Sequence, residues 1–104
     1  MRLEFPPHVA AIVRRLPPDV QRSVREAARA LGANPELGEP LRRELDGLWR
    51  YRVRRFRIVY RIDRSRRVIQ IFAVAHRRTI YEDVVDRLRL EKPAPARKRR
   101  RKRR

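Results

Sequence analysis

The chain has 104 residues, enough for one small domain, and a formal net charge of +18 at pH 7. Nine of the 30 basic residues lie in the final segment KPAPARKRRRKRR, so residues 1–91 keep 21 basic and 12 acidic residues, a net charge of +9. Such a surplus favours a polyanionic partner such as nucleic acid. Because cysteine is absent, disulfides, thiol nucleophiles and thiolate metal sites are excluded, and two histidines are too few for a multi-histidine zinc site.

Membrane and export signals are not indicated either. The apolar run Val9–Val13 is too short for a secretion signal, and no run approaches the roughly twenty apolar residues that span a bilayer. The sequence therefore predicts a cytoplasmic protein that has no membrane partner.

The first elements in chain order are a strand and two helices. Residues 1–5, MRLEF, alternate polar and apolar side chains and predict a short strand that ends at a pair of prolines. Apolar residues at helical spacing then predict one helix over about 9–16 and, after a second proline pair, another over about 20–31. The apolar stripe of this helical hairpin needs a sheet to cover.

Three strand-like runs follow, at about residues 48–54, 56–62 and 67–75, and their short connections predict an antiparallel meander. A tight turn at Arg54-Arg55 would place Arg52 opposite Arg57, with aromatic and aliphatic side chains on one face and arginines on the other. Primed two-residue turns favour Asn and Gly, so a bulge or a longer loop is the alternative connection.

A third helix begins near Thr79, because Thr79-Ile80-Tyr81-Glu82 matches the capping-box pattern and apolar residues then recur at helical spacing. Residues 92–104 contain only Lys, Arg, Pro and Ala and predict a disordered basic tail after a domain of residues 1–91. The predicted fold class is α+β, in the order βααβββα: an N-terminal strand and a helical hairpin packed on a small antiparallel sheet, then a C-terminal helix.

The predicted opposition of Arg52 and Arg57 is the first candidate site. Like charges directly opposite each other destabilise an antiparallel pair, which suggests that an anion such as a phosphate binds between them. The alternative is a solvated face in a chain that prefers arginine throughout, since all three lysines, Lys92, Lys98 and Lys102, lie in the tail.

The segment AHRRTIY is the second candidate site, because it brings His76, Arg77 and Arg78 to the start of the third helix, with Tyr81 in its first turn. Free N–H groups at a helix N-terminus attract anions, and a tyrosine there is placed to act as a general base or to stack on a nucleobase. A core tyrosine and a partly buried strand-end histidine are the alternatives. No phosphate-binding glycine loop, dinucleotide fingerprint or metal-spaced cluster is present, so no metal and no small-molecule cofactor is expected.

The order of these parts, with NPELGEPL after the helical hairpin, then LDGLWRYRVRRFRIVYRID and AVAHRRTIY, resembles the RelE/ParE superfamily of type II toxin–antitoxin toxins over residues 1–90. The resemblance implies a small toxin that is silenced by a cognate antitoxin. RelE-like members cleave mRNA in the ribosomal A site, which implies the ribosome and mRNA as partners. ParE-like members share the fold but poison DNA gyrase without cutting RNA.

The resemblance also implies which residues act. An mRNA endonuclease in which the RNA 2′-OH attacks its adjacent phosphate is the expected activity, and a gyrase inhibitor and a plain RNA-binding module are the alternatives. The residues with expected catalytic roles are Arg52, Arg57, Arg77 and Tyr81. Of the residues expected to bind RNA, Arg50 follows from the resemblance, and Arg54, Arg61, His76 and Arg78 follow from their place in the two basic stretches. Two departures from the family pattern are Arg54-Arg55 in the hairpin turn and Ala75 in place of a common glycine.

Overall fold

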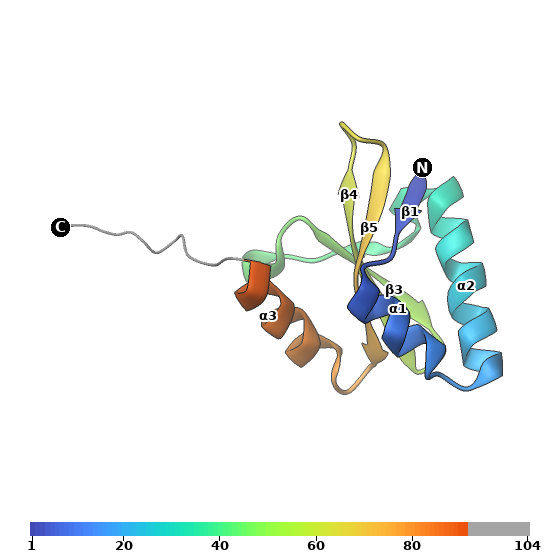
Figure 1. Ribbon diagram of the computed structural model, residues 1–104. Coiled ribbons are helices and arrows are strands. Elements are labelled where there is room, and N and C mark those ends of the chain that lie inside the picture. The colour runs from blue at the N-terminus through green and yellow to red at the C-terminus, as the bar shows by residue number, and fades with distance from the viewer. Residues whose placement is uncertain (92–104) are drawn as a thin grey trace.

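The computed structural model describes residues 1–91, with side chains as far as Leu90, so the predicted basic tail lies outside the described residues. The helices and strands in chain order are β1 (Arg2–Glu4), α1 (Pro7–Arg14), α2 (Pro18–Ala33), β2 (Glu39–Pro40), β3 (Leu48–Val53), β4 (Phe56–Asp63), β5 (Val68–His76) and α3 (Ile80–Glu91). Two short 3₁₀ turns, η1 (Pro35–Leu37) and η2 (Arg43–Leu45), flank β2. The α+β fold class is confirmed, with α1 and α2 on one side of the sheet and α3 on the other (Figure 1).

The two proline pairs start the helices of the hairpin. Pro7 and Pro18 occupy the first turns of α1 and α2, and the prolines before them, Pro6 and Pro17, have extended backbone angles. A proline is tolerated at this point because its missing N–H would have no helical acceptor and its φ already suits a helix. Both helices therefore begin two residues earlier than the apolar spacing alone predicts.

The sheet has five strands in the order β1-β5-β4-β3-β2. The predicted antiparallel meander of β3, β4 and β5 is confirmed, and the sheet as a whole is mixed because β1 pairs in parallel with β5, with Leu3 opposite Ile69. Parallel pairing needs a long crossover, and many residues separate the two strands. At the other edge, the two-residue strand β2 pairs with β3 and sets Glu39 opposite Arg50.

The β3–β4 hairpin has the predicted tight turn, with Val53 opposite Phe56 and Arg52 opposite Arg57. The bulge or longer loop considered for this connection is wrong. Arg54 instead adopts the left-handed region with a φ of 57°. An L-residue pays for this conformation with steric strain between its Cβ and the following carbonyl.

A register shift does occur, but between β4 and β5. Val59 pairs with Ala73 and Tyr60 pairs with Ile71, so Phe72 has no partner and β5 bulges. Because of this extra residue, Phe72 and Ala73 both join the apolar cluster under α3.

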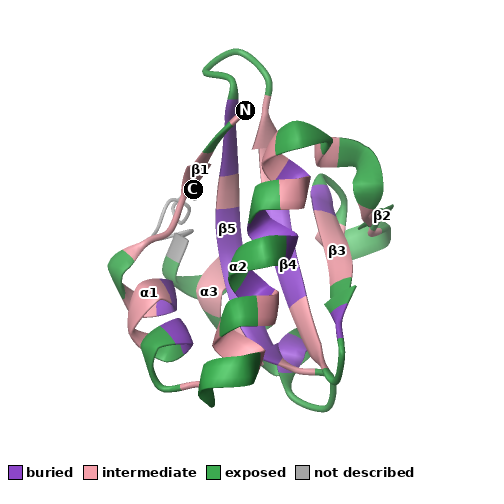
Figure 2. Cartoon of the chain, turned by 90° about the vertical axis from the view of Figure 1, so that its right-hand side faces the viewer, coloured by how far each residue is buried: buried purple, intermediate pink, exposed green. Residues whose placement is uncertain are grey.

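Each face of the sheet has its own core. Figure 2 looks onto the side covered by α1 and α2 and shows buried residues along β4 and β5. There, Ile58, Tyr60 and Ile71 pack against α1 and α2. On the other face, α3 packs Ile80 and Val84 against a second cluster.

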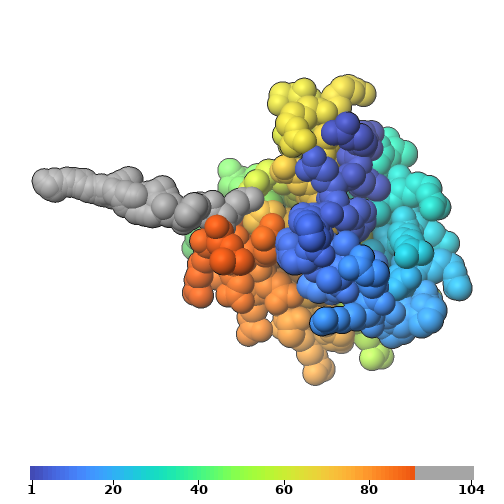
Figure 3. All heavy atoms as spheres, in the orientation of Figure 1, coloured from blue at the N-terminus to red at the C-terminus, as the bar shows by residue number. Residues whose placement is uncertain are grey.

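The second face is only partly covered, because α3 is the one helix on that side among residues 1–91 and the arginines of β3 and β4 occupy the rest of the face. Beside the part of β5 that does not pair with β1, α1 and α3 lie next to each other (Figure 3). Together with Phe72, Ala73 and Val74 of β5 they line a pocket of about 190 Å³. No helix in residues 1–91 is long and apolar enough to cross a bilayer.

Candidate functional site

The uncovered part of the sheet beside α3 carries the predicted basic residues. Strand alternation places Arg50 and Arg52 of β3 and Arg57 of β4 on the same side as Val59, which packs under α3. Arg52 and Arg57 are direct cross-strand partners, as predicted. The like charges that the hairpin register forces together therefore lie on one surface.

Arg57 is the centre of this positive cluster. Its Nη1 donates to the carbonyl oxygens of Phe56 (2.8 Å) and Arg54 (3.1 Å), so main-chain acceptors hold the guanidinium in place. Burial, and then the charges of Arg52, Arg50 and Arg77, lower the pKa of Arg57 from its ordinary value. This is the electrostatic signature of cations that lie close together without enough anions between them.

Three of these cations lack an acidic partner. Among the described residues, no carboxylate forms an ion pair with Arg52, Arg57 or Arg77, although Arg50 pairs with Glu39. Arg52 and Arg77 are exposed to solvent. The cluster therefore has the charge and the access to receive an anion from outside.

Tyr81 joins the cluster from α3. Arg50 Nη1 donates to the Tyr81 hydroxyl at 2.5 Å, and Arg50 Nη2 donates to Glu39 Oε1 at 2.6 Å. Tyr81 is 40% exposed, so the alternative reading of a core tyrosine is wrong. The three side chains come from β3, α3 and β2, and their residues lie 11 and 31 positions apart in the chain.

Glu39 was missed by the sequence reasoning. The hydrogen bond and then the charge of Arg50 lower the pKa of Glu39, and the charge of Arg52 adds to the effect, so this carboxylate is ionised at neutral pH. The sequence offered one weak signal: Glu39 follows Gly38 in a turn-rich segment and precedes Pro40. Nothing in that pattern could identify Arg50 as its partner.

A shallow pocket of about 310 Å³ opens beside this group. It is lined by Leu37, Gly38, Glu39, Arg50, Tyr51 and Arg52. Its size is near the lower limit of small-ligand pockets, and its charged side chains are Arg50, Arg52 and Glu39.

The end of β5 is tied to the hairpin turn. The Arg77 N–H donates to the Arg55 carbonyl at 2.7 Å, which brings the backbone of Arg77 beside β4. The Thr79 hydroxyl donates to the His76 carbonyl oxygen at 3.4 Å. In a capping box it would instead accept the main-chain N–H of Glu82. The chain then enters α3 at Ile80, one residue before Tyr81.

The other predicted RNA-binding residues lie away from the centre of the cluster. Arg54 forms an ion pair with Asp19 of α2 at 2.8 Å, on the opposite side of the sheet. The Arg61 guanidinium stacks over the Phe72 ring, with its carbon 5.2 Å from the ring centroid. Arg61 is on the same face as Arg57, but Val59 separates the two along β4.

His76 and Arg78 complete the predicted set. His76 is opposite Phe56 in the sheet, and the two rings meet edge to face at 5.7 Å. Its Nδ1 accepts the N–H of Arg78 at 3.2 Å, and Arg78 itself is exposed. By strand alternation His76 falls on the Phe56 face, away from Arg57, so the structure does not bring it to Tyr81.

The chain resembles known proteins in sequence and in structure. The family model described as the ParE toxin of the type II toxin–antitoxin system parDE matches residues 8–81. The chain is 41% identical over 69 residues to Toxin RelG of Mycobacterium tuberculosis, a match that covers 64% of this chain and 79% of that protein.

Solved structures give a consistent result. The RelBE2 toxin–antitoxin complex of Mycobacterium tuberculosis matches with a TM-score of 0.67 and 34% identity, covering 72% of this chain and 95% of that one. A mutant of the E. coli toxin RelE in the free state also has a TM-score of 0.67, at 18% identity, over 84% of this chain and 96% of that one. The second likeness concerns the fold alone.

Proposed function

We propose that this chain, which belongs to the RelE/ParE superfamily of type II toxin–antitoxin toxins, is an endonuclease that cleaves mRNA on the ribosome. One observation carries the proposal: Arg52, Arg57 and Arg77 have no acidic partner among the described residues, and they surround a surface that also presents Tyr81. A phosphodiester brings the negative charge that this surface lacks.

The chemistry fits a cluster of fixed cations. The 2′-hydroxyl of one nucleotide loses its proton as its oxygen forms a bond to the adjacent phosphorus. The bond to the 5′-oxygen of the next nucleotide breaks, and that oxygen takes up a proton as it leaves. Negative charge builds on the phosphoryl oxygens in between. Donors held in place before the reaction stabilise that charge more than they stabilise the ground state. Arg57 is held in this way by two main-chain carbonyls.

Tyr81 is the residue that we assign to proton transfer. Arginine is a poor proton carrier because its guanidinium keeps its proton throughout the ordinary pH range. Tyr81 is exposed and is oriented by the hydrogen bond from Arg50. His76 is the weaker candidate, because its Nδ1 is engaged by Arg78 and its ring packs on Phe56.

The test is expression of the chain in bacterial cells, with growth and primer extension on cellular mRNA as readouts. Arg57→Ala and Arg77→Ala should each abolish most toxicity, since loss of one preorganised donor typically costs about 10²- to 10³-fold in rate. Arg29→Ala is the matched control, because Arg29 is an exposed arginine of α2 across the sheet. Tyr81→Phe keeps the ring but cannot exchange a proton, so it separates proton transfer from stacking.

Cleavage ends inside coding regions that vanish in Arg57→Ala would support the endonuclease. Toxicity that persists in Arg57→Ala and Arg77→Ala alike would contradict it.

A second candidate is a non-catalytic inhibitor of DNA gyrase, because the family model that matches residues 8–81 is the ParE one. Supercoiling by gyrase, measured in the same cells, separates the two functions. Growth arrest with intact mRNA and blocked supercoiling would transfer the assignment to the gyrase inhibitor. RNA affinity without either effect would leave a plain RNA-binding module.

We also propose a cognate antitoxin as partner, since three of the matching structures are toxin–antitoxin complexes. A basic surface without acidic partners must be neutralised in a silent complex, so an acidic, amphipathic segment that covers the arginines or displaces α3 suits this role. Co-expression with the adjacent gene should give a tight complex. An unchanged affinity in the double variant Arg52→Glu, Arg57→Glu would place the antitoxin elsewhere.

A further inference from the structure

We propose that Glu39 is a positioning residue, which holds Arg50 against Tyr81 and at the same time weakens the binding of RNA. The inference rests on the proposed endonuclease function and assigns a role to a carboxylate whose hydrogen bond is to Arg50. It follows from two features of the structure: the loop that carries Glu39 is held in place, and the Arg50 guanidinium donates to both Glu39 and Tyr81.

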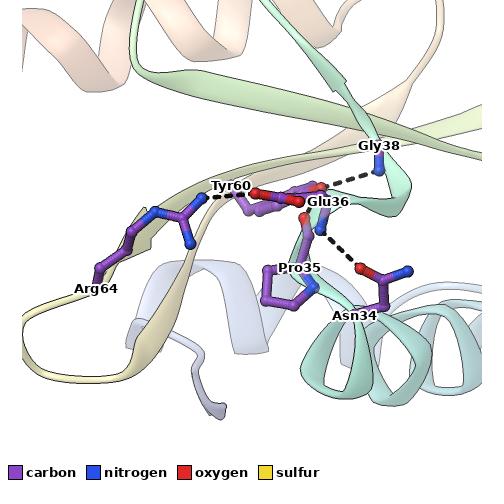
Figure 4. Close-up of polar contacts among 6 residues, drawn as sticks. All are labelled: Asn34, Pro35, Glu36, Gly38, Tyr60 and Arg64. Atoms are coloured by element: carbon purple, nitrogen blue, oxygen red, sulfur yellow. Dashed lines mark hydrogen bonds and ion pairs between the residues drawn. The ribbon is translucent and has the colours of Figure 1, made fainter.

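The loop that carries Glu39 is fixed by a buried tyrosine. The side chain of Tyr60 has no exposed surface, and its hydroxyl lies between two main-chain groups of the loop (Figure 4). It accepts the Gly38 N–H at 3.1 Å and donates to the Pro35 carbonyl at 2.7 Å. Burial raises the pKa of Tyr60, so the hydroxyl keeps the proton that it donates.

Gly38 shows how tightly the loop is seated. A Cβ at this position would lie 2.5 Å from the Arg50 carbonyl oxygen and 2.6 Å from the Tyr60 hydroxyl, so only glycine fits. The Asn34 side chain fixes the start of the loop by accepting the Glu36 N–H at 3.3 Å. Glu39 follows Gly38 in the chain and lies opposite Arg50, because β2 pairs with β3.

The guanidinium of Arg50 donates hydrogen bonds to two partners. Its Nη2 donates to Glu39 at 2.6 Å, and its Nη1 donates to Tyr81 at 2.5 Å. Because the guanidinium is planar and rigid, a carboxylate that fixes one end also sets the direction of the other. Without Glu39, Arg50 would be free to turn towards a bound phosphate, and Tyr81 would lose its only hydrogen-bond partner among the described residues.

The role of Glu39 is not to stabilise the fold. Its side chain is 64% exposed, and exposed ion pairs contribute little to stability. Its negative charge, however, is close enough to interact with the charges of Arg50 and Arg52, and it therefore weakens their attraction for a polyanion. Loss of Glu39 should therefore have opposite effects on the two steps: slower cleavage, because Tyr81 is no longer oriented, and tighter RNA binding.

Four variants of the full-length chain separate the effect of the negative charge of Glu39 from the effect of its hydrogen bond to Arg50. Glu39→Ala removes both, and Glu39→Gln removes the charge but keeps an oxygen that accepts from Arg50. Tyr60→Phe keeps the charge and frees the loop. Glu36→Ala is the matched control, because Glu36 is on the same loop but pairs with Arg64 at 2.9 Å, on the side away from the cluster. Thermal melts verify that each variant is folded.

Cleavage is measured in single turnovers on ribosomes programmed with a short mRNA. Binding is measured with a fluorescent single-stranded RNA whose 2′-hydroxyls are methylated. We expect Glu39→Ala to cleave about 10- to 100-fold more slowly, the range in which a misplaced catalytic group acts, while it binds the RNA more tightly. Tyr60→Phe should slow cleavage with unchanged RNA affinity. Glu39→Gln should bind more tightly yet cleave within a few-fold of the native chain, and Glu36→Ala should match the native chain in both.

A third readout does not depend on cleavage. Fluorotyrosine incorporated in place of tyrosine gives a ¹⁹F signal for Tyr81, assigned by its absence in Tyr81→Phe. We expect this signal to shift in Glu39→Ala and to stay in place in Glu36→Ala. An unshifted signal, or parallel loss of cleavage and RNA binding in Glu39→Ala, would overturn the role of Glu39. A native chain that cleaves no RNA but shows the expected shift would instead reject the endonuclease and leave the positioning of Tyr81 by Glu39 intact.

Discussion

Replacement of Arg54 by glycine should leave the protein more stable than replacement by alanine, although both changes remove an ion pair with Asp19. Arg54 has a φ of 57°, where an L-residue is strained by about 1–2 kcal/mol and glycine is not. Glycine gives back part of this gain, about 0.5–1 kcal/mol, because it makes the unfolded chain more flexible. The net stabilisation relative to alanine at the same position is therefore about 0.5–1 kcal/mol.

Alanine is the matched comparison because Arg54→Ala and Arg54→Gly lose the same exposed ion pair with Asp19. Both also keep the Arg54 carbonyl that accepts from Arg57. In a domain of this size, 1 kcal/mol corresponds to roughly 4–8 °C in melting temperature, so the glycine variant should melt roughly 2–8 °C above the alanine variant.

The assay is thermal and urea unfolding followed by circular dichroism. A stability of Arg54→Gly equal to or below that of Arg54→Ala would refute the assignment of strain to this turn. RNA affinity should hardly change in either variant beyond the effect of one lost charge, because the Arg54 side chain is directed at α2 rather than at the arginine cluster.

The remaining predictions concern the loop, one histidine and the tail. Gly38→Ala should destabilise the protein by about 1–3 kcal/mol in urea unfolding, because the new methyl group would displace the Tyr60 hydroxyl from its main-chain partners. Burial and then the charge of Arg87 lower the pKa of His8 in the folded protein below its ordinary value of 6.5. The unfolded chain therefore binds this proton at a higher pH than the folded chain does, and stability falls as the pH drops from 6.5 to the lower pKa of the folded state. His8→Gln should reduce that acid sensitivity in melts between neutral and acidic pH. Removal of residues 92–104 should leave the melting temperature unchanged and reduce the salt dependence of ribosome co-sedimentation, and an unchanged salt series would contradict the second part.

Local patterns in the sequence were sufficient to predict the three helices, the strands β1, β3, β4 and β5, and one important register, but not the two-residue strand β2. Alternation over residues 48–62 predicted that Arg52 is opposite Arg57, and the structure confirms it. This was possible because a tight turn fixes the register of adjacent strands, and the period of two then assigns every side chain to a face. The helical hairpin was equally predictable, since its apolar residues recur at helical spacing and prolines delimit it.

The tertiary structure alone decided which arginines face the candidate site and what holds them there. Arg54 and His76 were grouped with the cluster because they are near it in sequence, yet Arg54 pairs with Asp19 and His76 packs on Phe56. Side-chain direction at a turn or a strand end depends on single backbone angles, such as the left-handed φ of Arg54, and sequence periodicity does not encode them.

The contacts between distant segments were equally beyond the sequence. Glu39, Arg50 and Tyr81 belong to three elements, and each had a plausible local role as a loop acid, a strand cation or a helix residue. Their meeting depends on the docking of α3 against the sheet and on the seating of the Gly38 loop against Tyr60. Packing over long sequence separations sets both, because the free energy of burying α3 and Tyr60 is gained only when the whole sheet has formed.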